Sequence, residues 1–344
     1  VVIGRFQVFH GAHLELLKEA ASLASQVVVL IGSAFKPRTP KNPFTWTERV
    51  GVIRSELGDL DAGSKFTFHP LVDHPYSDVA WAVQVQSAIP KFCDTQRGDT
   101  PTIVIVGHEK DDSSYYLDMF PQWDVVKVAA KEGGISATEF RDKFFGAWNS
   151  KVDLFTWISD TDLPYSTKLF LTEFAMQSAY TVLCREQKMV LDYKESWKAA
   201  PYPPTFVTTD AVVIQSGHVL LVKRRTAPGK GLTALVGGFV GQDETIETAM
   251  LRELREETRL KVPEPVLRGS IKQSKVYDSP DRSLRGRTVT VAYLIELPSV
   301  GPLPKVKGGD DAEKAMWVPL SDIRREDMFE DHFDIIMDLV GVPL

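Results

Sequence analysis

The chain has 344 residues, more than the roughly 250–300 that one hydrophobic core usually serves, so its length predicts two domains. Apolar residues make up 43% of the chain and charged residues 25%, which excludes a disordered chain, a collagen-like fibre and a coiled coil. The formal net charge is -6, from 40 Lys and Arg against 46 Asp and Glu. This balance argues against general affinity for nucleic acid, but it leaves room for a local basic pocket that binds a small phosphate ligand.

The two cysteines, Cys93 and Cys184, are too far apart in the sequence to form a metal-like spacing. Two cysteines in so long a chain also make no disulfide scaffold, so we expect a reducing compartment and a cytoplasmic protein. Apolar runs reach only about six residues, whereas a membrane span needs roughly 20, and no signal-peptide pattern is present. We therefore expect neither nucleic acid nor a membrane as a partner.

Strand-like and helix-like segments alternate through the first half of the chain. Strands are expected at 1–6, 27–31, 65–71, 102–106 and 123–129, and helices at 13–24, 45–57, 78–89 and 138–147, with mostly helical structure at 166–193. The strands are apolar runs without period-two alternation, which is typical of strands buried on both faces. Strand–helix alternation of this kind predicts an α/β domain with a parallel, doubly wound sheet at residues 1–195.

The alternation of strand-like and helix-like segments ends at a proline-rich stretch near residue 200. This stretch predicts a linker at 196–205. Beyond it we expect strands at 207–215, 218–225, 287–297 and 315–318, and helices at 244–258 and 333–340. Ser216-Gly217 between the first two strands is a hairpin signal. Residues 206–344 are therefore predicted to form a mixed α+β domain.

The first candidate site follows the first strand, where Gly4-Arg5-Phe6-Gln7 leads to His10 and His13 at the start of a helix. Open α/β sheets bind ligands at such junctions, and helix N-termini suit phosphate. Residues three apart on a helix can face the same side. Two imidazoles aimed at one phosphate would stabilise the charge of a phosphoryl-transfer transition state. The alternative is a polar loop in which one histidine merely caps the helix.

A second segment, residues 135–141, follows a later strand and opens another helix. Ser136 or Thr138 can cap that helix, and Arg141 lies one turn further on. Hydroxyls, free backbone amides and a guanidinium group together suit phosphate. Taken alone, this segment would fit an ordinary helix cap better than a phosphate site.

Together the two segments resemble the HxGH and ISSTxxR motifs of the nucleotidylyltransferase superfamily, over roughly residues 1–190. Ala12 and Ala137 depart from the motifs. Gly4-Arg5-Phe6-Gln7 is similar to the nicotinamide-nucleotide adenylyltransferase branch, although Val8 stands where that branch usually has proline. The resemblance implies a Rossmann-like fold and transfer of AMP from ATP to the 5′-phosphate of a nucleotide, without a covalent enzyme intermediate.

The same resemblance assigns roles to individual residues. His10 and His13 would stabilise the α-phosphate, Arg141 with Ser136 and Thr138 would hold the β and γ groups, and Mg²⁺ would accompany ATP. The nucleotide-binding candidates are Gly4, Arg5, Phe6, Gln7, Lys36, Arg38, Trp81, Gly107, Ser136 and Thr138. Lys36 and Arg38 equally fit a solvated basic loop. Trp81 is either a stacking partner for nicotinamide or a core tryptophan.

The helix expected at 244–258 carries the second candidate site. Its apolar stripe of Ile246, Ala249 and Met250 continues, at about 100° per residue, into three carboxylates, Glu253, Glu256 and Glu257. Burying three like charges is costly unless cations neutralise them, and clustered carboxylates suit Mg²⁺ or Mn²⁺. The alternative is a solvated helix with ion pairs four residues apart, such as Arg252 with Glu256.

This segment resembles the Nudix box Gx5Ex7REUxEExGU, and the resemblance covers about residues 205–344. Its members here are Gly238, Glu244, Arg252, Glu253, Leu254, Glu256, Glu257 and Leu260, with Arg259 in place of the final glycine. The resemblance implies hydrolysis of a nucleoside diphosphate linked to another moiety. Metals held by Glu253, Glu256 and Glu257 would activate a water, Arg252 would orient these glutamates, and Asp310, Asp311 or Glu313 would serve as general base.

The basic loop at 279–287 is similar to the ADP-ribose pyrophosphatase branch. Arg282, Arg285 or Arg287, with Gly238, would then contact ADP-ribose, although each arginine equally fits an exposed hairpin. The whole chain resembles bifunctional proteins that join a nicotinamide mononucleotide (NMN) adenylyltransferase to an ADP-ribose pyrophosphatase. Its small-molecule partners would be ATP, NMN, NAD and ADP-ribose, and a homo-oligomer stays open.

Two alternatives accompany this reading. The first half could adenylate another acceptor, as a pantetheine-phosphate adenylyltransferase does, or transfer a cytidylyl group. The second half could be a Nudix module that senses a ligand without catalysis.

Overall fold

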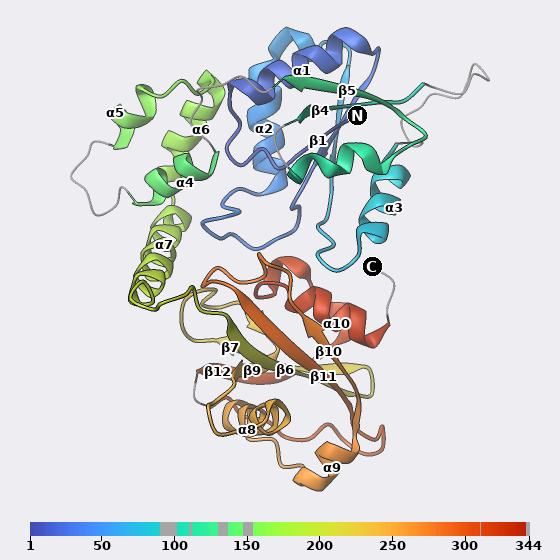
Figure 1. Ribbon diagram of the computed structural model, residues 1–344, viewed down its shortest axis with the longest axis vertical. Coiled ribbons are helices and arrows are strands. Elements are labelled where there is room, and N and C mark those ends of the chain that lie inside the picture. The colour runs from blue at the N-terminus through green and yellow to red at the C-terminus, as the bar shows by residue number, and fades with distance from the viewer. Residues whose placement is uncertain (90–101, 110–111, 130–136, 147–153, 310, 342–344) are drawn as a thin grey trace. The chain divides into compact units, whose positions relative to one another are not determined.

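The computed structural model describes residues 1–89, 102–109, 112–129, 137–146, 154–309 and 311–341 (Figure 1). Contacts between residues divide the chain into two compact units, Val1–Gln187 and Lys188–Leu344. Helix α7 (Ser178–Ser196) continues through this division, and residues 197–205 form turns and bends before the next strand. The linker expected at 196–205, and with it the domain boundaries, stays a prediction.

The first unit is built on a five-stranded parallel sheet with the order β3-β2-β1-β4-β5. Its strands are β1 (Val2–Gly4), β2 (Val27–Ile31), β3 (Phe66–Pro70), β4 (Val104–Glu109) and β5 (Asp124–Ala129), and its connecting helices include α1 (Gly11–Leu23), α2 (Trp46–Leu57) and α3 (Asp78–Ala88). The strand order reverses between β1 and β4. This topology confirms the predicted parallel, doubly wound fold, and the reversal is where such folds bind ligands.

Every residue of β2 is buried, because both faces of the sheet are covered. Val27, Val29 and Ile31 point to a core shared with α1 and α2. Val28 and Leu30 point to a second core on the opposite face. The uninterrupted apolar run in the sequence therefore reflects two-sided burial, as predicted.

A helical layer completes the first unit. It consists of α4 (Ala137–Gly146), α5 (Leu154–Ser159), α6 (Tyr165–Ala175) and the first part of α7, packed around an aromatic cluster that includes Phe140, Phe144 and Phe174. The buried Thr167 hydroxyl of α6 donates a hydrogen bond to the Phe9 carbonyl at 3.0 Å, which fixes this layer to the loop after β1.

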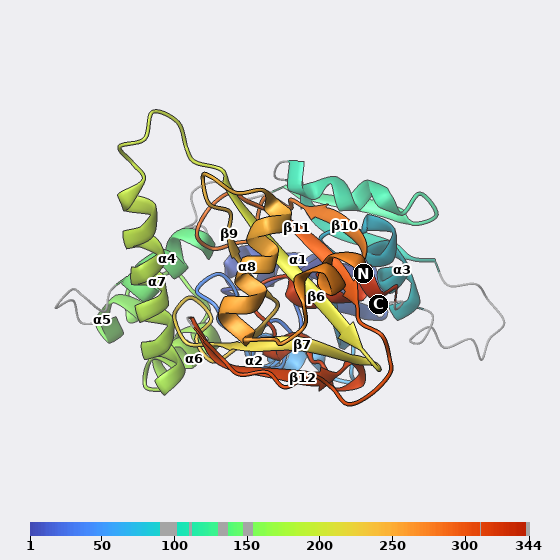
Figure 2. The same cartoon turned by 90° about the horizontal axis from the view of Figure 1, so that it is seen from below.

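The second unit contains a mixed sheet with the order β10-β11-β6-β7-β12, in which β6 and β11 are parallel; β8 pairs with β7 and β9 with β6. Its elements are β6 (Phe206–Gln215), β7 (His218–Arg224), β8 (Thr233–Ala234), β9 (Val236–Phe239), α8 (Ile246–Thr258), α9 (Glu264–Gly269), β10 (Ile271–Tyr277), β11 (Thr288–Glu296), β12 (Ala312–Pro319) and α10 (His332–Val340). Helices α8 and α10 lie on opposite faces of this sheet (Figures 1 and 2). The predicted α+β class is confirmed.

Several elements differ from the expectations. The first strand ends at Gly4 rather than at residue 6, because Phe6 has a left-handed φ of 50°. The hairpin at Ser216-Gly217 is confirmed, with φ of 49° and 73° at the two turn residues. Strands β8, β9 and β10 and helices α5 and α9 have no counterpart in the predicted elements.

In the part of the chain that the structure describes, no helix has both the length and the apolar character of a membrane span.

Candidate functional site

His10 and His13 lie together at the start of α1. The His10 backbone N–H donates to Nδ1 of His13 at 3.3 Å, and the two imidazole rings stack with centroids 3.7 Å apart. Because Nδ1 of His13 accepts a hydrogen bond, the proton of its neutral ring is on Nε2. The expectation that the two imidazoles face the same side is met.

Arg141 joins the two sequence motifs of the first unit. It is a buried residue of α4 whose guanidinium donates to the Gln7 carbonyl, 134 residues away, and to Oγ1 of Thr138 at 3.1 Å. Burial and the nearby Arg5 lower the pKa of Arg141 to about 10, so the group stays protonated at neutral pH. The Arg141 guanidinium therefore lies against the loop after β1 and near Arg5, so two cations are available there to an anion. Ser136 lies outside the described residues.

The basic loop places its two candidate cations in ion pairs. Lys36 Nζ lies 2.9 Å from Asp73, and Arg38 makes a two-pronged pair with Glu48 at 2.7 and 2.8 Å. The Arg38 guanidinium also donates to the Pro43 carbonyl at 2.6 Å. In this structure the two side chains therefore hold the loop in shape, and a nucleotide role for them would require them to exchange partners.

The Gly4-Arg5-Phe6-Gln7 segment also has structural roles. A Cβ on Gly4 would fall 2.8 Å from the buried Phe6 ring, so any other residue there would have to displace this ring. The buried Gln7 side chain donates to the Phe44 carbonyl and accepts from the Phe44 N–H, both at 3.1 Å. Gln7 therefore fixes the end of the basic loop, while the side chain of Arg5 is exposed.

Trp81 and Gly107 lie where packing alone explains them. Trp81 is partly buried, with its ring 6.2 Å from Tyr116 and 6.1 Å from Phe120 between centroids. A Cβ on Gly107 would fall 2.6 Å from a methyl group of Leu117. The core interpretation of Trp81 is thus the one that the described contacts support.

His108, next to Gly107 in β4, has side-chain contacts on both sides of the point where the strand order reverses. Its ring nitrogens lie 3.2 Å from the carbonyl oxygens of Ala12 and Val128. The His108 ring thereby lies between the first turn of α1 and β5, and the one N–H of its neutral ring donates to one of these two carbonyls.

Arg49 is a further residue of this site that the sequence analysis missed. Its buried guanidinium donates to the backbone carbonyls of Arg5, Gly32 and Ser33 at 2.5, 2.7 and 3.4 Å. It therefore holds the loops after β1 and β2 together. A signal was present, because Arg49 stands on the apolar stripe of α2 with Val52 and Ile53.

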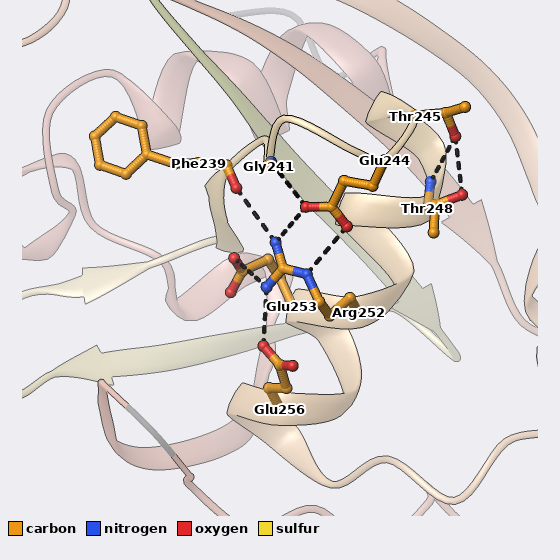
Figure 3. A network of polar contacts seen from close by, with 8 residues as sticks. All are labelled: Phe239, Gly241, Glu244, Thr245, Thr248, Arg252, Glu253 and Glu256. Atoms are coloured by element: carbon orange, nitrogen blue, oxygen red, sulfur yellow. Dashed lines mark hydrogen bonds and ion pairs between the residues drawn. The ribbon is translucent and has the colours of Figure 1, made fainter.

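In the second unit, α8 carries the candidate carboxylates. Thr245 caps the helix by accepting a hydrogen bond from the Thr248 N–H at 3.2 Å. Arg252 lies at the centre of a polar network (Figure 3). Its guanidinium binds Glu244 at 2.8 and 3.1 Å, Glu253 at 2.8 Å and Glu256 at 2.9 Å. The predicted orienting role of Arg252 fits this geometry.

The three carboxylates do not share one environment. The Glu253 side chain is 13% exposed and Glu257 is buried, but the Glu256 side chain is 46% exposed. The expectation of an inward-facing stripe therefore holds for Glu253 and Glu257 and is wrong for Glu256, which α8 turns toward solvent and Arg252.

Glu253 and Glu257 nevertheless fit a divalent cation. Burial and the charge of Glu253 raise the pKa of Glu257 to about 8, as expected for a buried carboxylate close to a second carboxylate. The Gly237 N–H donates a hydrogen bond to Glu257 Oε2 at 3.3 Å, but the pKa of Glu257 stays raised despite this bond. Hard carboxylate oxygens are what Mg²⁺ and Mn²⁺ prefer. Within the described ranges, no three such side chains are already gathered around one point.

Gly238 has a packing role beside these glutamates. A Cβ there would fall 2.7 Å from the carboxyl carbon of Glu253, so the bare backbone of β9 makes the space that Glu253 occupies.

The three arginines of the 279–287 loop differ in their environments. Arg282 is buried and makes two hydrogen bonds of 2.9 Å to Asp331, so this pair occupies it in place of the predicted contact with a ligand. Arg287 binds the Asp278 carbonyl and lies 3.7 Å from that residue's carboxylate. Arg285 has its guanidinium 4.9 Å from the centre of the Phe239 ring and remains the candidate for contact with a diphosphate.

Of the candidate general bases, Asp310 lies outside the described residues. Asp311 and Glu313 are both exposed, and Glu313 lies 3.8 Å from Lys223.

Comparisons with known proteins cover both units. A family model described as cytidylyltransferase-like matches residues 1–143, and a NUDIX domain model matches residues 204–339. The adenylyltransferase for nicotinamide or nicotinic acid mononucleotide from Acinetobacter baylyi is 34% identical over 42% of this chain and 74% of its own length. An ADP-ribose pyrophosphatase from Methanocaldococcus jannaschii is 34% identical over 45% of this chain and 84% of its own length.

One solved protein matches both halves at once. The crystal structure of a bifunctional NMN adenylyltransferase/ADP ribose pyrophosphatase from Francisella tularensis has a TM-score of 0.88 at 37% identity, over 100% of this chain and 98% of that one. The complex with AMP and a manganese ion from the same organism has a TM-score of 0.86 at 37% identity, over 99% and 98% of the two chains. This chain belongs to the family of bifunctional NMN adenylyltransferase/ADP-ribose pyrophosphatases.

Proposed function

We propose that this protein is a bifunctional, cytoplasmic enzyme of NAD metabolism. Its first unit transfers AMP from ATP to NMN and releases NAD and pyrophosphate. Its second unit hydrolyses ADP-ribose to AMP and ribose 5-phosphate. The observation that carries the proposal is the 37% identity over 100% of this chain to one protein that is named for both activities.

In the first reaction, the phosphate of NMN attacks the α-phosphorus of ATP and pyrophosphate leaves. The Nε2–H of His13, fixed by the His10 N–H at Nδ1, donates to the α-phosphate as negative charge develops on it. The guanidinium groups of Arg5 and Arg141 neutralise the departing β and γ phosphates. Mg²⁺ that accompanies ATP would supply further neutralisation.

In the second reaction, Glu253 and Glu257, with Glu256 on the same helix, hold the divalent cation. A Mg²⁺ or Mn²⁺ ion held there would polarise the diphosphate and lower the pKa of an attacking water. Arg252 keeps Glu253 and Glu256 in place through its hydrogen bonds of 2.8 and 2.9 Å. Asp311 or Glu313, the two described candidates, would accept the proton of the water.

The connected network around Arg252 favours catalysis over a sensing module. Glu244, Glu253 and Glu256 all bind this one guanidinium, so these three carboxylates are ordered relative to one another.

The test incubates the intact protein with NMN and ATP, and separately with ADP-ribose, and identifies the products. His13→Ala should abolish NAD synthesis and leave ADP-ribose hydrolysis unchanged, whereas Glu257→Gln should do the opposite. Incubation of ATP with phosphopantetheine tests the alternative acceptor. Incubation of CTP with NMN and with phosphopantetheine tests transfer of a cytidylyl group. Absence of NAD from the first incubation, or of AMP from the second, would refute the corresponding half of the proposal.

A further inference from the structure

A single residue, Leu235, joins β8 to β9 in the second unit. Strand β8 pairs with β7 and β9 pairs with β6, so the chain changes its pairing partner at this residue. Leu235 is buried, and its N–H donates to Nδ1 of His332, the first residue of α10, at 2.8 Å. Because a buried backbone N–H needs an acceptor, His332 supplies here what a neighbouring strand supplies elsewhere in the sheet.

The His332 ring is held in the form that accepts this hydrogen bond. Since Nδ1 accepts, the proton of the neutral ring is on Nε2, which lies 3.8 Å from Oδ1 of Asp210 in β6. Burial lowers the pKa of His332, so the ring is neutral at neutral pH. Oδ2 of Asp210 accepts a hydrogen bond from the Thr290 hydroxyl at 2.6 Å, which fixes the carboxylate that faces the ring.

The same carboxylate also lies against β9. Asp210 and Gly237 are opposite each other in the register of β6 and β9. A Cβ on Gly237 would fall 2.7 Å from Oδ1 of Asp210, so the backbone of β9 passes directly over this oxygen. His332 and Asp210 therefore act on β9 at two nearby points, Leu235 and Gly237.

Strand β9 leads from Leu235 to the carboxylates of α8. The Gly237 N–H donates to Oε2 of Glu257 at 3.3 Å, and the missing Cβ of Gly238 makes the space that Glu253 occupies. Gly237 and Gly238 follow Leu235 by two and three residues. A shift of the backbone at Leu235 would therefore disturb both contacts.

His332 acts on these carboxylates through the sheet. Helices α8 and α10 lie on opposite faces of the sheet, so β9 is the element that links the histidine of one helix to the glutamates of the other (Figures 1 and 2). In metal sites, residues that orient the ligands without touching the metal change its affinity by about 10–100-fold when they are replaced.

We propose that His332 is a positioning residue of the divalent-cation site, holding β9 where Glu253 and Glu257 can bind the cation together. The inference rests on the proposed metal-dependent hydrolysis of ADP-ribose. The alternative is a histidine that only fills the core beside α10. The two differ in what position 332 requires, because positioning requires an acceptor for the Leu235 N–H, whereas filling requires only volume.

The experiment measures binding of Mn²⁺ to the intact protein, without nucleotide, by the electron paramagnetic resonance signal of the free ion. Binding that is lost in Glu257→Gln defines the site on α8. His332→Asn and His332→Leu form a matched pair, because the two side chains have similar shapes but only asparagine places an acceptor, Oδ1, where Nδ1 lies. His332→Leu should raise the dissociation constant about tenfold or more, and His332→Asn should stay within about threefold of the unmodified protein.

A control separates positioning from general loosening of α10. Asp334→Asn breaks the buried ion pair of the same helix with Arg325, 2.6 Å long, and should lower the unfolding temperature without changing the dissociation constant of Mn²⁺. If His332→Leu does not fold, His332→Phe replaces it, since phenylalanine retains a ring but offers no acceptor.

Equal dissociation constants in His332→Leu and His332→Asn would overturn the proposal, whether both are changed or neither is. An equal loss of affinity in Asp334→Asn would overturn it too, as would the absence of Glu257-dependent Mn²⁺ binding in the unmodified protein. Failure of the unmodified protein to hydrolyse ADP-ribose would instead refute the proposed function, and Mn²⁺ binding would still test the role of His332.

Discussion

The missing side chain at Gly238 determines where the Glu253 carboxylate lies. A Cβ at this position would fall 2.7 Å from the carboxyl carbon of Glu253, at the flexible end of that side chain. A methyl group there would displace the carboxylate without disturbing the sheet. Gly238 is thus a requirement of the site rather than of the fold.

We therefore expect Gly238→Ala to reduce ADP-ribose hydrolysis by at least about tenfold while the midpoint of thermal unfolding changes little, because a displaced ligand costs activity more than stability. Initial rates and a melting curve check this. Gly269→Ala is the matched control, since a Cβ there meets nothing within 4 Å. Full activity in Gly238→Ala would contradict the packing role given to this glycine.

At the scale of single elements, α8 ends in a conformation that suits glycine. Arg259 follows the helix with φ of 51° and ψ of 30°, the left-handed region, and its N–H donates to the Arg255 carbonyl at 2.9 Å. This position holds glycine in the motif that the segment resembles. The arginine keeps the same turn at the expense of close contact between its Cβ and the backbone.

Arg259→Gly should raise the free energy of unfolding of the second unit by about 1 kcal/mol, because glycine adopts this φ without that contact. Chemical denaturation followed by tryptophan fluorescence measures the change. Arg259→Ala removes the same side chain but retains Cβ, so it should show no gain. Equal stabilisation by alanine and glycine would show that the charge, not the backbone, is responsible.

How far the sequence predicted each element depended on how the element is buried. Strand β2 was predicted with its full extent, because two-sided burial leaves an apolar run. Strand β10 was missed, because five of its seven residues are exposed and no alternation marks it. Strand β9 is only four residues long and contains Gly237 and Gly238, which weaken any strand signal.

For the candidate sites, the sequence predicted what depends on local spacing and missed what depends on the fold. The carboxylates of α8 and the His10–His13 pair could be found because local spacing places them on one helix. The ion pairs of Lys36 with Asp73 and of Arg282 with Asp331 could not be predicted, because they join residues 37 and 49 positions apart that only the fold brings together. Burial of Arg49 was foreseeable from its place in an apolar stripe, but its carbonyl partners were not.

At the scale of the whole molecule, the two units have separate sites. A ligand that binds one unit should therefore raise the unfolding temperature of that unit and leave that of the other unchanged. A divalent cation that binds Glu253 and Glu257 stabilises the folded second unit by mass action, by about 2.7 kcal/mol at a free concentration 100 times its dissociation constant.

We expect Mn²⁺ or Mg²⁺ to raise the unfolding temperature of the second unit in the unmodified protein and to have little effect in Glu257→Gln. Differential scanning calorimetry with and without a chelator measures this independently of activity. The chelator should also abolish ADP-ribose hydrolysis, and added metal should restore it. An equal thermal shift in Glu257→Gln would place the cation elsewhere.

Gln7 shows how a short sequence signature can be set by something other than a ligand. Its amide gives and receives one hydrogen bond each with the backbone of Phe44, at the end of the loop that carries Lys36 and Arg38. Glutamate offers no proton for the carbonyl, and asparagine is shorter by one methylene, so neither substitute spans the gap with both bonds intact. Gln7, the last residue of Gly4-Arg5-Phe6-Gln7, thus fixes the end of a loop that is distant in the sequence. Proteins with glutamine at this position should have the same loop conformation, whatever nucleotide they adenylate.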